Sequence, residues 1–139
     1  METWEAIRAR RNVRVYTEQP IAAPDLDRIL EAGRRSPSSQ NSQPWDFVVV
    51  TGRQHLQELS KVWSHAHHVA ISAATVALVA PVRGEEWQRL SVQYDLGQAT
   101  MSMMLAAADL GVGSGHPPSR TRRSPASCSA SPRTDPAPG

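Results

Sequence analysis

The chain has 139 residues, enough for one domain, and its formal net charge is only +2. It contains no run of eighteen apolar residues and begins with an acidic Met1-Glu2 pair, so we expect a cytoplasmic protein without a signal peptide or membrane span. The single cysteine, Cys128, excludes an internal disulfide and a cysteine-based metal cluster within one chain. Redox chemistry would therefore need a bound cofactor.

The first predicted element is a short amphipathic helix over residues 2–10, because Trp4 and Ile7 have helical spacing with charged residues between them. The segment 10–14 follows. In an extended backbone its alternation would place Arg10, Asn12 and Arg14 on one face. Guanidinium groups bind phosphate oxygens bidentately and stay charged, so this face favours an anion. The alternative is an ordinary solvated basic face.

A second helix is predicted to begin at Pro24, with Asp25 and Asp27 in its first turn, where negative charge stabilises a helix. Gly33 either ends this helix or lets it pack closely. Arg34 and Arg35 fall where cations suit the C-terminal dipole, so we assign them a structural role. The expected buried residues are Leu26, Ile29, Leu30 and Gly33.

A polar loop over residues 36–45 comes next, and its prolines Pro37 and Pro44 restrict the backbone to a definite shape. Its side chains and backbone N–H groups supply many hydrogen bonds, which suits a flat polar ligand with several carbonyls and ring nitrogens. The alternative is an ordinary helix-to-strand connection. The side chains concerned are Ser38, Ser39, Gln40, Asn41 and Gln43.

Taken together, Arg-Arg-Asn-Val-Arg at 10–14 and Pro-Ser-Ser-Gln-Asn-Ser-Gln-Pro-Trp at 37–45 resemble the flavin-binding signature of the FMN-dependent nitroreductase family. Asn12 stands where serine is commoner, and it keeps a hydrogen-bonding group. The resemblance runs from about Trp4 to about His116. It implies an α+β, three-layer fold with a central sheet flanked by helices, in an incomplete FMN-binding domain over residues 1–116.

The resemblance also implies a function. Bound FMN would take a hydride from NADH or NADPH and pass electrons to a nitroaromatic, quinone or similar small acceptor, with no catalytic side chain. The phosphate side would be met by Arg10, Arg11, Asn12 and Arg14. The ring and ribityl side would be met by Pro37, Ser38, Ser39, Asn41 and Gln43, from the other subunit of a homodimer, together with Ser114. The rival function is a non-enzymatic basic binding module whose arginines would meet nucleic acid. Against it, the sequence lacks the aromatic residues interleaved with basic ones that usually accompany such binding. We therefore expect neither nucleic acid nor membrane as a partner.

The middle of the chain predicts strands over residues 47–51 and 75–80, both buried on two faces, with their relative direction left open. Between them, an amphipathic helix over 53–63 would turn four residues inward: Leu56, Leu59, Val62 and Trp63. Three histidines follow, His65, His67 and His68. They lack nearby carboxylate or thiolate ligands, so we interpret them as a polar surface turn rather than a metal site.

The longest predicted element is a helix over residues 85–110, whose second half is apolar nearly all round. Such a helix is buried in a core or against another subunit, and in the family it lies in a homodimer interface with two flavins between the subunits. We interpret its methionines as packing residues. Asp95 and Gln98 could be core polar groups or interface residues. The glycine-rich turn 111–115 would end the helix and let the backbone approach the flavin.

The composition changes at residue 117. Residues 117–139 contain six prolines, five serines and four arginines and no large apolar residue, which predicts a disordered tail. The family continues at this point with a helix, two strands and an arm that embraces the partner. We therefore expect an impaired fragment, an inactive truncated homologue being one alternative. The tail itself could be a frameshift product: after loss of one base near His116, every serine encoded by TCN is re-read as Phe, Leu, Ile or Val.

Overall fold

A computed structural model describes residues 1–62 and 64–116. In chain order the elements are α1 (Thr3–Ala9), α2 (Ala23–Arg34), the 3-10 turn η1 (Ser39–Asn41), β1 (Asp46–Val50), α3 (Arg53–Ser60), α4 (His67–Ala70), β2 (Thr75–Val79) and α5 (Glu86–Asp109). The predictions for Trp63 and for the tail, including its disorder and the frameshift, lie outside the described residues.

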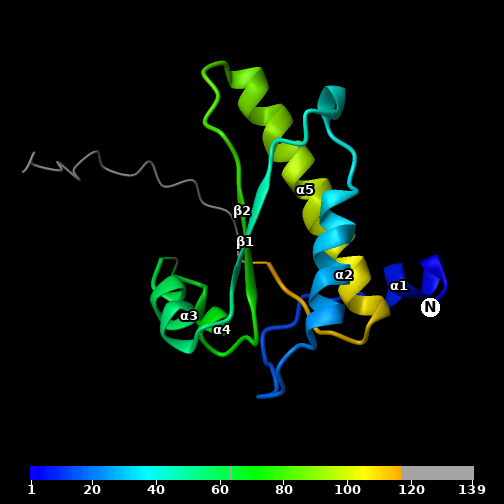
Figure 1. The fold of residues 1–139 in the computed structure, drawn as a ribbon, viewed down its shortest axis with the longest axis vertical. Coiled ribbons are helices and arrows are strands. Elements are labelled where there is room, and N and C mark those ends of the chain that lie inside the picture. Colours follow the sequence, from blue (N-terminus) through cyan, green and yellow to red (C-terminus); the bar gives the residue numbers. More distant parts are fainter. Residues whose placement is uncertain (63, 117–139) are drawn as a thin grey trace, which may run out of the picture.

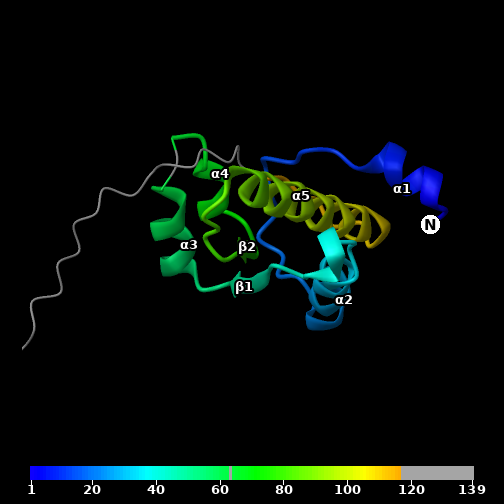
Figure 2. The same cartoon turned by 90° about the horizontal axis from the view of Figure 1, so that it is seen from above.

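Strands β1 and β2 pair antiparallel, with Asp46 opposite Val79 and Val50 opposite Thr75. Seen from above, the sheet lies between α3 and α4 on one side and α2 and α5 on the other (Figure 2). This arrangement confirms the expected α+β fold with helices flanking a central sheet. The expected burial on both faces is wrong, because Val48 and Val79 are 49% and 47% exposed. In the described residues only two strands pair, and no element covers these side chains.

The main core joins α2 and α5 to the sheet. Ile29, Met103 and Ala107 are buried there, with Phe47 and Leu78 packed against them. Gly33 lies inside α2 rather than ending it. A Cβ at this position would lie 2.9 Å from the Met103 side chain and 3.2 Å from the Phe47 ring, so the glycine permits close packing between the two helices.

Arg34 and Arg35 have the structural role that was expected. Each donates from Nε to a different oxygen of Glu31 at 2.6 Å. Hydrogen bonds from Arg34 and then Arg35 lower the pKa of Glu31 to about 2. These two guanidinium groups are therefore committed within α2 and do not belong to the anion-binding segment.

A second cluster of buried residues, formed by Leu56, Ala66 and Val69, joins α3 and α4 to the end of β1. Helix α3 ends at Ser60, earlier than predicted, and Val62 is 54% exposed instead of facing inward. The histidines also differ from the prediction. His67 begins the short helix α4, and His68 is buried at 7% exposure. Its ring lies beside Arg14 and Tyr16 of the N-terminal segment, which are distant in the sequence.

Helix α5 runs the length of the molecule (Figure 1). Glu85 caps its start through a reciprocal capping box with Gln88, and Gly111, with a φ of 71°, follows its end. The Val112 N–H donates to the Ala107 carbonyl at 2.8 Å, which closes the helix as a Schellman-type cap does. This closure confirms the predicted glycine turn and aims residues 112–116 back toward the N-terminal segment.

One face of α5 and the apolar face of α1 remain exposed. On α5, Trp87, Leu90, Tyr94 and Met101 fall within an arc of about 60° at 100° per residue. They are between 46% and 71% exposed, and we call them the apolar stripe of α5. Trp4 of α1 is 67% exposed. No helix among residues 1–62 and 64–116 is both long and apolar enough to cross a membrane.

Candidate functional site

The arginine segment 10–14 lies against the glycine turn that follows α5. Asn12 forms an isolated parallel β-bridge with Ser114, and the Val13 N–H donates to the Ser114 carbonyl at 2.8 Å. A Cβ on Gly115 would lie 2.5 Å from the Val13 carbonyl oxygen, so this approach needs glycine there. The structure thus brings together Ser114 and the arginine segment, which are separated by a hundred residues in the sequence.

Arg14 is held from two sides. Its Nη1 donates to His68 Nε2 at 2.7 Å, and its Nη2 donates to the His116 carbonyl at 3.0 Å. Burial, followed by the charge of Arg14, lowers the pKa of His68, so the neutral ring accepts this hydrogen bond. A guanidinium has five N–H groups. Arg14 therefore keeps about three donors for a ligand.

Tyr16 supports the same segment from inside. Its hydroxyl donates to the Val13 carbonyl at 2.9 Å, and its ring lies 6.5 Å from that of His68. Burial raises the pKa of Tyr16. The sequence analysis missed Tyr16 and His68, because the contact between Arg14 and His68 spans 54 positions and no local spacing signals it.

The other residues predicted to contact the phosphate are accessible to solvent. Arg11 and Asn12 are exposed and Arg10 is partly so. Arg11 Nη1 donates weakly to the Arg8 carbonyl at 3.3 Å. In the described part of the chain, Arg10, Arg11 and Arg14 form no ion pair with a carboxylate. Their positive charge is therefore not neutralised within the subunit.

The polar loop has an unusual backbone. Gln40, Asn41 and Gln43 have positive φ angles of 54°, 53° and 46°, a region that side-chain-bearing residues enter at a cost. Ser38 Oγ accepts the Gln43 N–H at 2.9 Å, and Gln43 Nε2 donates to Asn41 Oδ1 at 3.2 Å. Pro37 and the side chains of the loop remain largely exposed, with Ser38 partly buried. The loop has a defined backbone, but Gln43, directly before Pro44, has a positive φ instead of the extended conformation that a following proline favours.

Helix α5 holds this loop with polar side chains. The Ser39 N–H donates to Asp95 Oδ2 at 3.0 Å, and Ser91 Oγ donates to Ser39 Oγ at 2.7 Å. Asp95 is only 1% exposed. Of the two roles left open for Asp95, the structure supports a core polar group, with the loop as its partner. A buried carboxyl group in an apolar helix needs such a partner, which was the available signal.

The two groups of predicted contacts are attached at different places along α5, the loop to its N-terminal half and the arginine segment to the turn after its C-terminal end (Figure 1). The loop is fixed at Asp95, whereas Ser114 and the arginine segment lie beyond Asp109, where the helix ends. Fourteen residues of helix correspond to about 21 Å at 1.5 Å per residue. Within one subunit, no hydrogen bond between described residues joins the loop to the arginine segment.

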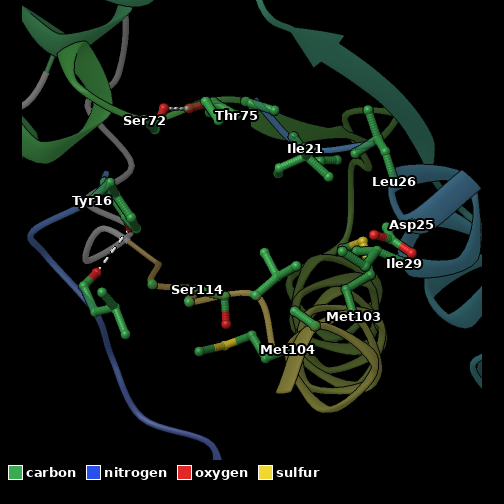
Figure 3. A pocket seen from close by; sticks show the side chains of 18 of the residues that line it. Tyr16, Ile21, Asp25, Leu26, Ile29, Ser72, Thr75, Met103, Met104 and Ser114 are labelled. Atoms are coloured by element: carbon green, nitrogen blue, oxygen red, sulfur yellow. Dashed lines mark hydrogen bonds between the residues drawn. The ribbon is translucent and has the colours of Figure 1, made fainter. Parts of the chain in front are cut away.

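A cavity of about 780 Å³ lies between β2, α2, α5 and the N-terminal segment. Its walls are mainly apolar, with Ile21, Leu26, Ile29 and Met103 around it in Figure 3. Of the residues predicted to contact the cofactor, only Ser114 reaches its wall. The cavity therefore differs from the polar, cationic surface that an anionic cofactor needs.

Comparisons with known proteins identify the family of the chain. The chain matches the model of the "Nitroreductase family" over residues 7–89. It is 32% identical over 113 residues to a candidate NADH dehydrogenase/NAD(P)H nitroreductase of Archaeoglobus fulgidus, covering 81% of this chain and 65% of that protein.

Two solved structures are also similar. Nitroreductase A of Vibrio parahaemolyticus has a TM-score of 0.72 and 26% identity, covering 78% of this chain and 51% of the other. A candidate nitroreductase of Desulfovibrio desulfuricans, solved in complex with FMN, has a TM-score of 0.67 and 27% identity, with coverages of 78% and 63%. The chain thus spans less than two thirds of the length of these relatives. Since the family model covers more than half of its residues, the chain belongs to the nitroreductase family.

Proposed function

We propose that the chain supplies both halves of an FMN site that is completed in a homodimer, and that it serves an NADH- or NADPH-dependent oxidoreductase. When bound, FMN would supply the hydride and electron transfer. The electron acceptor would be a small nitroaromatic, quinone or similar molecule. Family membership and an FMN-bound structural relative support this proposal. The protein's own part is to bind and orient the cofactor.

The arginine segment fits the phosphate end of FMN. Three guanidinium groups lie within five residues, without a carboxylate partner in the described part of the chain. Arg14 is oriented by His68 and the His116 carbonyl and keeps free donors. Guanidinium groups form charge-assisted, bidentate hydrogen bonds to phosphate oxygens, and these are stronger than hydrogen bonds between neutral groups.

The loop fits the ring and ribityl chain. Its hydroxyl and amide side chains are largely exposed, on a backbone of defined shape. The backbone N–H groups of Ser39, Asn41, Ser42 and Gln43 are used within the subunit and hold that shape. FMN presents carbonyls, ring nitrogens and ribityl hydroxyls, which pair with such donors and acceptors. The loop is anchored at Asp95, about 21 Å along α5 from the helix end that precedes the phosphate side, so we expect a second subunit to bring the halves together.

The apolar stripe of α5 supports a second copy of this chain as the partner. A two-fold axis across the middle of α5 would set the N-terminal half of one helix beside the C-terminal half of the other. The loop of one subunit would then approach the arginine segment of its partner. Gly97 lies at the midpoint of α5 and at the edge of the stripe. A Cβ there meets nothing within 4 Å, so close helix approach in a dimer explains the glycine better than any contact within the subunit.

The observation that carries the proposal is that the loop and the arginine segment are attached at different places along α5, a helix that also carries an exposed apolar stripe. Titration of the purified chain with FMN, followed by flavin fluorescence, tests it together with the Arg14→Ala variant. Loss of charge-assisted hydrogen bonds of about 1.5–3 kcal/mol should weaken binding roughly 10- to 150-fold. Arg34→Ala is the matched control, because Glu31 already holds that guanidinium.

Two results would count against the proposal. If Arg14→Ala binds FMN as tightly as the unaltered chain does, the phosphate contacts are assigned to the wrong face. If the chain takes up no FMN but binds a DNA duplex, the basic binding module is the better function.

A further inference from the structure

The polar loop adopts a backbone that its residues do not favour. Gln40, Asn41 and Gln43 all have positive φ without being glycine. Left-handed conformations of this kind persist only where surrounding contacts determine them. The contacts that hold the loop therefore decide whether its donors keep the positions that a flavin requires.

The contacts within the loop are at its surface. The Gln43 N–H to Ser38 Oγ and Gln43 Nε2 to Asn41 Oδ1 hydrogen bonds are both exposed to water. Water competes with such bonds, so they contribute little to fixing the backbone. A contact that is better shielded from water is therefore needed to fix the backbone of the loop.

Asp95 provides that contact. It is 1% exposed, and its Oδ2 accepts the N–H of Ser39, the first residue of η1. Ser91, one turn earlier on α5, adds a hydroxyl contact to Ser39 Oγ from a more exposed position. This hydrogen bond is partly buried, so water competes with it less than with the two surface bonds, and breaking it would leave the buried Asp95 carboxyl group without this partner.

From this geometry we infer that Asp95 is a positioning residue for the flavin site: it holds residues 38–43 in the conformation that presents their donors to the cofactor. Asp95 directly follows Tyr94 of the apolar stripe in the sequence, so the two residues belong to the same turn of α5. It thereby ties the loop to the helix that would lie in the dimer interface, and so fixes the loop relative to the partner's arginine segment. This inference rests on the proposed FMN site.

Two substitutions of similar size separate the hydrogen bond from mere packing. Asp95→Asn keeps an oxygen that can accept the Ser39 N–H, whereas Asp95→Leu removes the acceptor. Ile29→Val is the stability control, because Ile29 lies in the core between α2 and α5, and the hydrophobic cluster around it includes no residue of the loop. Each full chain is measured for amide hydrogen exchange at Ser39, FMN affinity and free energy of unfolding.

For Asp95→Leu we expect faster exchange at Ser39 and a rise of about tenfold in the Kd for FMN, the factor that corresponds to one buried hydrogen bond. For Asp95→Asn we expect exchange and affinity near those of the unaltered chain. Ile29→Val should lower the free energy of unfolding without changing either readout.

The inference is overturned if Asp95→Leu leaves the Ser39 exchange unchanged, or if Asp95→Asn fails to restore it. It is equally overturned if Ile29→Val weakens FMN binding as much as Asp95→Leu does, since the effect is then one of general stability. If the unaltered chain does not bind FMN, the proposed function fails, and the exchange measurement still decides whether Asp95 holds the loop.

Discussion

Replacing Gly97 by leucine should have opposite effects on the folded subunit and on the dimer. Glycine inside a helix costs about 0.8–1 kcal/mol relative to good helix formers. The position is exposed, and a Cβ there meets nothing within 4 Å. In an isolated subunit, Gly97→Leu should therefore stabilise α5 by about 0.8 kcal/mol.

In the dimer the same side chain would separate two closely packed helices. Overpacking typically costs about 1–3 kcal/mol per site, so two symmetric sites should cost about 2–6 kcal/mol. The dimer dissociation constant should then rise from about 30-fold to more than 10⁴-fold. Sedimentation equilibrium measures this constant, and urea unfolding at low protein concentration measures the subunit.

Gln57→Leu is the matched control, because it adds the same side chain to an exposed position of α3, away from the apolar stripe. It should leave the dimer constant unchanged. A Gly97→Leu chain that dimerises as tightly as the unaltered one would refute the crossing of α5 with its partner at this point. An unaltered chain that stays monomeric at all concentrations would refute the dimer itself.

Three further predictions concern other parts of the chain. Folding favours neutral His68, so the free energy of unfolding should fall as the pH drops below the usual 6.5 of histidine, and His68→Gln should reduce that slope in urea titrations at pH 8 and pH 5. The purified chain should oxidise NADH and NADPH slowly even with FMN bound, because the exposed Val48 and Val79 of the two described strands favour aggregation over a well-formed dimer. Steady turnover by a monodisperse dimer would contradict this. Resequencing the DNA after the His116 codon should reveal a shifted frame that encodes two further apolar strands, and an early stop in that frame would rule it out.

Local patterns in the sequence were sufficient for much of the fold. The spacing of Leu26, Ile29 and Leu30, with Pro24 near its start, predicted α2 to within one residue at its beginning. The glycine turn after α5 was also predicted, because only a residue that tolerates a φ of 71° closes a helix in this way. These signals act over a few residues and need no knowledge of the partners in space.

The predictions were wrong where residues distant in the sequence determine whether a side chain is buried. His68 was assigned to a surface turn because nothing near it signals Arg14, 54 positions earlier. The strands were expected to be buried on both faces, but an apolar run does not reveal how many strands a sheet has. Val48 is exposed for that reason.

The candidate site was predictable in its residue types and not in its assembly. The motifs named the arginine segment and the loop, and the structure placed Ser114 beside Asn12. The role of Asp95 remained open until its contact with Ser39 was visible. The assignment of the two halves to different subunits came from the family resemblance and belongs to the proposed function, because a single sequence carries no direct information on symmetry.

The most direct test of the account uses heterodimers. One subunit carries Arg14→Ala and the other Gln43→Gly, because glycine tolerates the φ of 46° at that position and removes the side chain. If each flavin site combines the arginine segment of one subunit with the loop of the other, one site of the two is intact and binds FMN with unaltered affinity.

The control heterodimer pairs an unaltered subunit with one that carries both substitutions. If the halves come from different subunits, neither site of this heterodimer is intact, so FMN binding is weakened at both. The opposite pattern, with no intact site in the first heterodimer and one in the second, would show that both halves come from one subunit and would contradict the central claim.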